Sequence, residues 1–303
     1  MKKKFYSNGK LLLTGEYLVL DGAEALAIPT VYGQQLKVKS HEHKLVFWKS
    51  YDNNNNCWFE AVFKVKQNHL FLVSDRNKIS ETLHNLLLEA GRLNPNFLKK
   101  LKSTSIKTTI DFDRNWGLGS SSTLINNIAQ WAKVDAYTLL NNSFGGSGYD
   151  IACAQNNKPI VYTNQPTPQA TVVDLKWNFK EHLFFVYLNQ KKDSKIAIAH
   201  YNKKGKKSSS ALADINQLTH DFVACTSLEN FEELMQEHER ILSKVLKLKP
   251  VKERLFPNYK GAVKSLGGWG GDFVLVTGDA SSKMYFAQKG YEVCVPFSEM
   301  VLK

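Results

Sequence analysis

Gly117-Leu118-Gly119-Ser120-Ser121-Ser122 is the stretch of this sequence that most strongly indicates its fold. Two glycines in a turn let backbone N–H groups approach an anion, and the serines can form the first turn of a helix. The apolar residues that follow recur at intervals of three and four, as on one helix face: Leu124, Ile125, Ile128, Ala129, Trp131 and Ala132. This glycine-serine loop therefore predicts a phosphate-binding helix N-terminus, although serine caps and turn glycines are also common without a ligand.

A second motif, Gly146-Ser147-Gly148-Tyr149-Asp150, follows the loop and can present a carboxylate. We expect the carboxyl group of Asp150 to lie close to the glycine-serine loop, where it can orient an acceptor for phosphate. The alternative is that Asp150 is only a helix-cap aspartate before Ile151.

The two ends of the chain carry further motifs. The first motif, Ser7–Tyr17, places Lys10 at the start of an apolar run and Glu16 after the glycine that ends it. A strand that carries Lys10 can hold a positive charge beside phosphates, and Glu16 can pair with a base or a metal. The third motif, Leu266-Gly267-Gly268-Trp269-Gly270-Gly271-Asp272, precedes the strand-like run Phe273–Val276.

Taken together, these motifs resemble those of the GHMP kinases, the small-molecule kinases named for galactose, homoserine, mevalonate and phosphomevalonate. The resemblance keeps the order of the motifs and spans most of the chain. Gly15-Glu16-Tyr17 and Gly148-Tyr149-Asp150 are most similar to the phosphomevalonate and mevalonate kinases, and Gly270-Gly271-Asp272 to the phosphomevalonate kinases.

The resemblance implies a two-domain α+β fold. Residues 1–170 would form a domain like domain 2 of ribosomal protein S5, and residues 171–303 a ferredoxin-like domain. It also implies transfer of the γ-phosphoryl group from ATP, with Mg²⁺, to a small anionic acceptor, with phosphomevalonate or mevalonate as the leading candidates. Partners other than ATP and the acceptor are not implied, and the oligomeric state stays open.

The resemblance also assigns roles to residues. Asp150 would take the acceptor's proton and Lys10 would stabilise charge on the transferring group. The nucleotide would be held by Gly117, Leu118, Gly119, Ser120, Ser121 and Ser122, with Ser121 also a ligand of Mg²⁺. The acceptor would be bound by Glu16, Ser147, Ser194, Lys195, Gly270, Gly271 and Asp272.

Three features depart from the family pattern. Asp113-Arg114-Asn115-Trp116 replaces the proline that usually opens the nucleotide loop, and Trp269 replaces a glycine of the third motif. Residues 136 to 149 contain neither Asp nor Glu, so the usual acidic magnesium ligand has no counterpart there. Metal binding would then depend on Ser121, substrate phosphates and water, because magnesium commonly retains several waters.

Composition agrees with a folded enzyme but leaves other classes open. The chain has 303 residues, 43% of them hydrophobic, and a formal net charge of +12. Lysine clusters are usually solvated faces, but an excess of positive charge can also attract a polyanion. A nucleotide-binding pseudoenzyme, a kinase for another small alcohol and a basic RNA-binding protein are the alternatives; nucleic acid is the less favoured partner because the basic runs are not interleaved with aromatic residues. No apolar segment is long enough to cross a bilayer, and we expect a cytoplasmic protein.

Periodicity predicts the main secondary structure. Strands are expected at 26–31, 34–39, 44–49, 58–65, 105–111, 182–188, 272–276 and 291–295, with a hairpin loop at 52–56. Helices are expected at 80–93, with Ser80 as the cap, and at 194–201, 209–226, 228–246 and 280–289.

Overall fold

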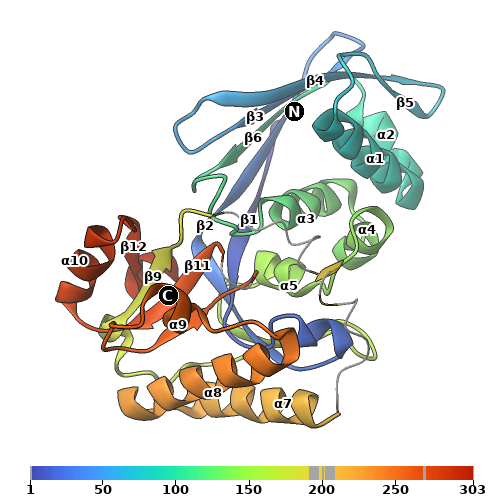
Figure 1. The fold of residues 1–303 in the computed structure, drawn as a ribbon. Coiled ribbons are helices and arrows are strands. Elements are labelled where there is room, and N and C mark those ends of the chain that lie inside the picture. Colours follow the sequence, from blue (N-terminus) through green and yellow to red (C-terminus); the bar gives the residue numbers. More distant parts are fainter. Residues whose placement is uncertain (1, 191–197, 200, 202–208, 269–270, 303) are drawn as a thin grey trace. The chain divides into compact units, whose positions relative to one another are not determined.

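The computed structural model describes every residue except 1, 191–197, 200, 202–208, 269–270 and 303. The chain forms two compact units (Figure 1). Unit 1 comprises Met1–Gly9, Tyr32–Arg114 and Leu118–Gln155, and unit 2 comprises Lys10–Val31, Asn115–Gly117 and Asn156–Lys303. Each unit mixes helices and strands, which confirms the predicted α+β class. The domain division at residue 170 stays a prediction.

Unit 1 contains a mixed sheet in the order β5-β4-β3-β6-β2. Its strands are the part of β2 (Ala25–Ser40) from Tyr32 onward, β3 (Val46–Tyr51), β4 (Cys57–Lys66), β5 (His69–Leu72) and β6 (Thr104–Ile110). β3 and β6 run parallel and the other neighbours run antiparallel. The strands expected at 26–31 and 34–39 are one continuous strand, since Gly33 does not interrupt β2.

Helices cover one face of this sheet (Figure 1). They are α1 (Lys78–Leu93), α2 (Pro95–Leu101), α3 (Ser120–Ala132), α4 (Ala136–Ser143) and α5 (Tyr149–Gln155). The strands alternate buried and exposed side chains, so every second residue of β3, β4 and β6 enters the core. Representative core residues are Leu36, Trp48, Phe63, Leu87 and Ile128.

The start of α1 corrects one prediction. Asn77, not Ser80, is the N-cap: its side chain accepts hydrogen bonds from the backbone amides of Ile79 and Ser80, each at 2.9 Å. The Ser80 hydroxyl accepts one from the Asn77 amide at 2.9 Å, which completes a capping box. Ser80 lies three residues inside the helix because both of its polar groups serve this reciprocal cap.

Unit 2 contains a four-stranded antiparallel sheet in the order β10-β11-β9-β12. These strands are β9 (Leu183–Tyr187), β10 (Val263–Ser265), β11 (Phe273–Thr277) and β12 (Cys294–Pro296). Of two short strands, β7 (Ile160–Thr163) pairs with the first part of β2, and β8 (Gln169–Val172) pairs with β7. β1 (Lys2–Leu12) also pairs with β2 and carries the chain from unit 1 into unit 2.

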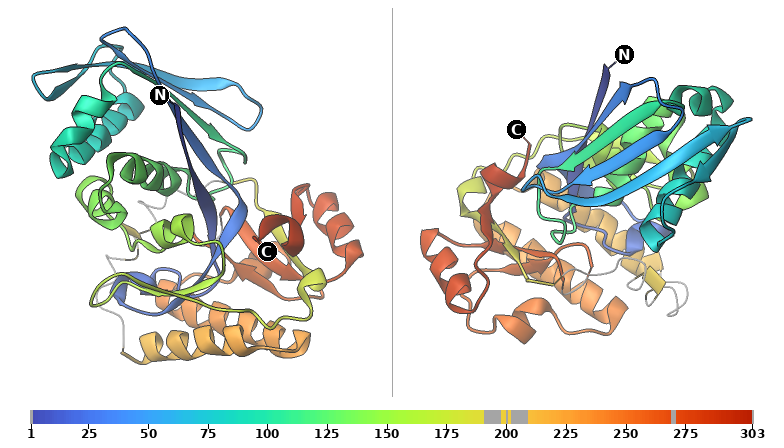
Figure 2. Two further views of the ribbon diagram at one scale, coloured as in Figure 1. Left: turned by 180° about the vertical axis from the view of Figure 1, so that it is seen from behind. Right: turned by 90° about the horizontal axis from the view of Figure 1, so that it is seen from above.

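The described helices of unit 2 include the three that were expected at 209–226, 228–246 and 280–289 and two short ones that were not expected. They are α7 (Ser209–Ala224), α8 (Leu228–Leu246), α9 (Val251–Leu255), α10 (Ala280–Gln288) and α11 (Phe297–Met300), with 3₁₀ turns at Leu18–Asp21 and Lys180–His182. α7 and α8 pack side by side (Figures 1 and 2). The strand expected at 291–295 begins only at Cys294. The helix expected at 194–201 falls largely outside the described residues. Among the described helices, none has the length and apolar character needed to cross a membrane.

Candidate functional site

Lys10 contacts Gly117, the first residue of the glycine-serine loop, within unit 2. Lys10 lies near the end of β1, and its Nζ donates a hydrogen bond to the carbonyl oxygen of Gly117 at 2.8 Å. Lys10 is half-buried, and this hydrogen bond holds its ammonium group beside the first residue of the loop. An ammonium has three N–H donors, and it can therefore hold this carbonyl and an oxygen of an anion at the same time.

The third motif ends against the same glycine. Gly117 has a φ of +65°, and a Cβ built on it would lie 2.4 to 2.7 Å from the carboxyl atoms of Asp272. Asp272 itself has a φ of +53°. Its backbone is held by two hydrogen bonds, from its N–H to the Gln190 carbonyl at 2.7 Å and from the Leu188 N–H to its own carbonyl at 2.8 Å. Only glycine fits at position 117, because any side chain there would overlap this carboxylate.

Trp116, which stands before the loop, is anchored in the same unit. Its ring meets the ring of Phe273 edge to face, with centroids 5.4 Å apart, and Phe273 also contacts Tyr187. Phe273 is the first residue of β11 and is buried. The aromatic contact therefore fixes the entry to the glycine-serine loop against the strand that follows the third motif.

In unit 1 the loop continues into α3. Gly119 is the N-cap residue, with a φ of +88° and no side chain to cap the helix. The Ser122 hydroxyl donates to the Gly119 carbonyl at 3.0 Å, and Thr123 donates to the side-chain oxygen of Gln34 at 2.7 Å. Ser121 is exposed. The first-turn amides of a helix have no intrahelical acceptor, so this end of α3 offers N–H groups and one exposed hydroxyl to an anion or its counter-ion.

The second motif starts α5 in the same unit. Gly146 and Gly148 both have positive φ, and half-buried Ser147 lies between them. Asp150 lies in the first turn of α5 and is half-buried; its Oδ1 accepts from the Ile151 N–H at 3.2 Å. α5 packs against α3, where the Asn126 amide donates to the carbonyl of Ala154 and the Gln155 amide donates to Asn126.

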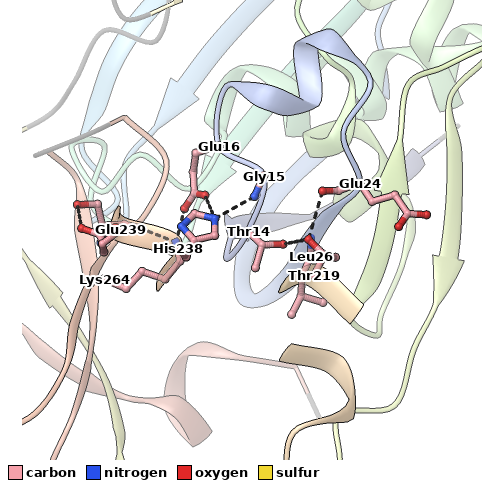
Figure 3. Close-up of polar contacts among 10 residues, drawn as sticks. Thr14, Gly15, Glu16, Glu24, Leu26, Thr219, His238, Glu239 and Lys264 are labelled. Carbon is pink, nitrogen blue, oxygen red and sulfur yellow. Dashed lines mark hydrogen bonds and ion pairs between the residues drawn. The ribbon is translucent and has the colours of Figure 1, made fainter. Parts of the chain in front are cut away.

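Glu16 of the first motif belongs to a buried charge cluster in unit 2 (Figure 3). Its Oε1 accepts from the Lys264 ammonium at 2.6 Å, and its Oε2 lies 3.1 Å from Nε2 of His238. The Gly15 N–H donates to the same His238 nitrogen at 3.2 Å. Lys264 belongs to β10 and His238 to α8, so three distant segments join at one carboxylate.

Glu239, next to His238 on α8, completes the cluster. The backbone N–H of Ser265 donates to its Oε1 at 3.0 Å, and the Ser265 hydroxyl donates to its Oε2 at 3.1 Å. Lys264 also donates to the Ser265 carbonyl at 3.0 Å. The residue that follows Ser265 is the first of the third motif. The cluster thus anchors the end of the first motif and the entry to the third.

Burial and charge shift the acids of the cluster in opposite directions. Burial by itself raises the pKa of Glu16, but attraction to Lys264 and His238 outweighs it and leaves the pKa below its ordinary value. Burial raises the pKa of Glu239 to about 7, helped by repulsion from Glu16 and opposed by Lys264. Burial also lowers the pKa of His238, together with repulsion from Lys264. One ionised carboxylate paired with one ammonium is therefore the arrangement that low dielectric favours.

Comparison with solved structures identifies the architecture. The mevalonate kinase of Methanococcus jannaschii matches with a TM-score of 0.70 and 15% identity over 98% of both chains. The Streptococcus pneumoniae phosphomevalonate kinase in complex with phosphomevalonate and AMPPNP matches with 0.66 and 16% over 95% of both chains. The Lactococcus lactis galactokinase complexed with galactose matches with 0.63 and 14%, over 95% of this chain and 88% of that one.

The chain has the GHMP kinase fold. The match extends over nearly the whole chain, which confirms the fold that the motifs predicted. By sequence alone, no family model and no curated protein matches. At 15 to 16% identity the fold is shared, but the roles of individual residues do not transfer with it.

The structure groups the predicted site residues unevenly. In unit 2 it brings together Lys10, Gly117 and Asp272. Gly271, which precedes Asp272 in the sequence, is buried. Leu118 is buried in unit 1. The predicted acceptor residues Ser194 and Lys195, as well as Gly270, lie outside the described residues.

Sequence reasoning missed Lys264, His238 and Glu239. One signal was present in α8, where His238 continues the helical spacing of Phe231, Met235 and Leu242, all buried. An ionisable residue at a core position of an amphipathic helix predicts a buried partner of opposite charge or a hydrogen bond. Lys264 gave no such signal, because a single lysine before a glycine motif reads as a surface residue.

Proposed function

We propose that this chain is an ATP-dependent small-molecule kinase of the GHMP type. The observation that carries the proposal is the contact of Lys10 with the Gly117 carbonyl, together with the placement of the Asp272 carboxylate against the same glycine. Residues 10, 117 and 272 come from three separate motifs, and a glycine is required where they meet. The similarity of the whole fold to kinases that differ in substrate supports the same class of reaction.

The start of α3 fits the phosphates of a nucleotide. The amides of the first turn and the positive end of the helix dipole favour an anion, and Gly119 lets it approach the backbone. Ser121, exposed at this turn, would hold Mg²⁺ together with phosphate oxygens and water. Among the described residues no three His, Cys, Asp or Glu side chains gather to bind a metal, and phosphate oxygens of the nucleotide would provide part of the coordination. When bound, the metal would neutralise charge on the phosphates.

Asp150 and Lys10 would act on the transfer itself. The acceptor oxygen forms a bond to the γ-phosphorus, the bond to the β–γ bridging oxygen breaks, and ADP leaves. An alcohol acceptor gives its proton to the carboxylate of Asp150, whereas a phosphate acceptor is only oriented by it. Lys10 would stabilise negative charge on the transferring group, and positioning supplies much of the remaining acceleration.

The acceptor is proposed to be a small anion, with phosphomevalonate or mevalonate first. The motifs favour these two, and similar structures include kinases for both. A galactokinase of the same fold matches almost as well, so another small alcohol is the second candidate. Glu16 is paired with Lys264 and buried, and it would support the acceptor side by holding the first motif in place rather than by touching the acceptor.

The proposal is tested by comparing the chain with its Asp150→Asn variant. ATP binding is measured by calorimetry, and ADP release is measured with each candidate acceptor. We expect the variant to bind ATP as the parent does and to lose about 10²- to 10⁴-fold in turnover. Asn141→Asp is the control, because Asn141 is exposed and the change is similar in size. A parent that binds ATP but phosphorylates nothing would identify a pseudoenzyme, and an active Asp150→Asn variant would reject the role of this carboxylate.

A further inference from the structure

The sheet of unit 1 carries a row of lysines on neighbouring strands. Lys37 of β2 lies opposite Lys107 of β6, and Lys107 lies opposite Lys49 of β3. Lys49 in turn lies opposite Glu60 of β4, with which it forms an ion pair at 3.2 Å. Directly paired residues of adjacent strands share one face of a sheet. Three ammonium groups therefore line up across three strands, and one carboxylate stands at the end of the row.

These side chains occupy the face of the sheet that helices do not cover. The residues between them are buried in the core under α1 to α4, among them Leu36, Ile106 and Trp48. In the view from above, the strands lie in front of the helices of unit 1 (Figure 2, right). We call this surface the open basic face; its members are Gln35, Lys37, Lys39, Phe47, Lys49, Tyr51, Glu60, Lys64, Phe71, Ser105, Lys107 and Thr109.

Aromatic rings lie among the lysines on this face. The Lys107 ammonium lies 4.0 Å from the centre of the Tyr51 ring. Phe71 of β5 lies opposite Lys64 and is 51% exposed, an unusual position for a phenylalanine. At the bulge beside Tyr51, the guanidinium of Arg114 lies 3.7 Å from the ring centre of Trp58. The basic runs of the sequence are not interleaved with aromatic residues, but the folded sheet interleaves them.

The lysine row is unfavourable for the fold itself. Like charges directly opposite each other on a sheet destabilise it, and a face that only needs solubility can alternate lysine with glutamate or threonine. Lys49 has such a carboxylate partner in Glu60, whereas Lys37 and Lys107 face each other across β2 and β6. An anion bound on this face would offset the repulsion between these two lysines.

We propose that the open basic face binds single-stranded RNA. The lysines would contact successive phosphates while bases stack on the rings of Tyr51 and Phe71, the combination by which flat sheets bind single strands. Gln35 and Thr109 lie in the row on one side of the paired lysines and Ser105 lies in the row on the other side, and all three can hydrogen-bond to 2′-hydroxyl groups. Duplexes do not present unstacked bases to a flat sheet, and an anionic membrane presents none at all. This inference does not depend on the proposed kinase activity, since none of these residues is assigned to it.

The test uses the full chain and a fluorescently labelled single-stranded RNA of mixed sequence, with binding followed by anisotropy over a range of salt. The variant Lys37→Gln/Lys107→Gln removes two phosphate contacts. It should weaken binding about 20-fold at 0.1 M salt and reduce the slope of log K against log salt by about 1.4. Tyr51→Ala should weaken binding about tenfold through lost stacking.

A matched control removes the same charge elsewhere in unit 1. Lys99→Gln/Lys100→Gln changes two exposed lysines of α2, on the helical side, and should leave RNA binding near the parent value. Thermal unfolding of Lys37→Gln/Lys107→Gln should show no loss of stability, because like-charge repulsion is removed. ATP-dependent activity should also stay at the parent level, which separates this test from that of the kinase.

Several results would overturn the proposal. The two lysine pairs could weaken binding equally, which would reduce the interaction to net charge. Duplex RNA or single-stranded DNA of the same sequence could bind more tightly than the labelled strand. Vesicles containing phosphatidylserine could be bound without competition from RNA, which would assign the face to a membrane instead.

Discussion

Replacement of Glu239 by glutamine should make the protein more stable at alkaline pH and nearly unchanged in acid. Glu239 is buried on α8, and Ser265 donates two hydrogen bonds to its carboxyl group. A glutamine has the same shape: its oxygen can accept from the Ser265 amide, and its NH₂ group can donate to the Ser265 hydroxyl. The variant therefore keeps the contacts and removes only the buried negative charge.

The magnitude follows from the raised pKa of Glu239. In the folded state this pKa is about 7, against an ordinary value of 4.5. The folded state thus holds the proton more tightly, so the stability that this group contributes is fully present below pH 4.5 and is lost as pH rises through 7. At about 1.4 kcal/mol per pH unit, the parent loses roughly 2 to 3 kcal/mol between pH 5 and pH 8 from this group. The glutamine variant has no such loss.

Urea unfolding followed by tryptophan fluorescence at pH 5 and pH 8 measures this difference. We expect the free energy of unfolding of Glu239→Gln, relative to the parent, to rise by about 2 to 3 kcal/mol from the lower to the higher pH. Glu233→Gln on the exposed side of the same helix is the control and should show no such change. The free energy of unfolding of the variant relative to the parent could instead be the same at both pH values, or fall as pH rises. Either result would mean that Glu239 is ionised in the fold and stabilises Lys264.

Three further changes test the packing around the motifs. Lys264→Met should lower the free energy of unfolding in urea by about 3 to 5 kcal/mol, because it leaves the buried Glu16 carboxylate unpaired. Adding Glu16→Gln to the same chain should recover part of that loss. Losses of stability that are purely additive would contradict the ion pair. Gly117→Ala should lower the melting temperature, because the added Cβ would overlap the Asp272 carboxylate, and Asp272→Gly should partly restore it. An unchanged melting temperature in Gly117→Ala would contradict the close approach of the two residues. Asn77→Ala should destabilise the protein by about 1 kcal/mol in urea unfolding through loss of the α1 cap, which an unaltered midpoint would disprove.

Local patterns predicted the parts of the fold that depend on nearby residues. The helix expected at 228–246 is α8 with the same bounds, because its apolar spacing and the Ser227 cap are both encoded within a few residues. The loop at 52–56 is also found, where Asp52 accepts hydrogen bonds from the amides of Asn54 and Asn56. β5 and β10 were missed because each is short and depends on a partner strand for its hydrogen bonds.

Non-local partners explain why part of the candidate site could not be predicted. The glycine motifs were found because a close backbone approach requires glycine, as at Gly117. The partners of Glu16 come from β10 and α8, more than 200 residues away, and no residue near Glu16 in the sequence indicates which partners these are. The lysines of the open basic face are hidden in the same way: Lys37, Lys49 and Lys107 are isolated in sequence, and only strand pairing aligns them.

Phosphorus NMR of the reaction mixture tests the proposed phosphoryl transfer most directly. The chain is incubated with ATP, Mg²⁺ and, in turn, mevalonate, phosphomevalonate, homoserine and a panel of sugars. We predict that with one of these acceptors the γ-phosphate signal of ATP is replaced by ADP and a new phosphorylated product, and that the Asp150→Asn variant forms this product at least about 10²-fold more slowly. Formation of the product at the parent rate by the variant, or hydrolysis of ATP to inorganic phosphate with every acceptor present, would contradict the account.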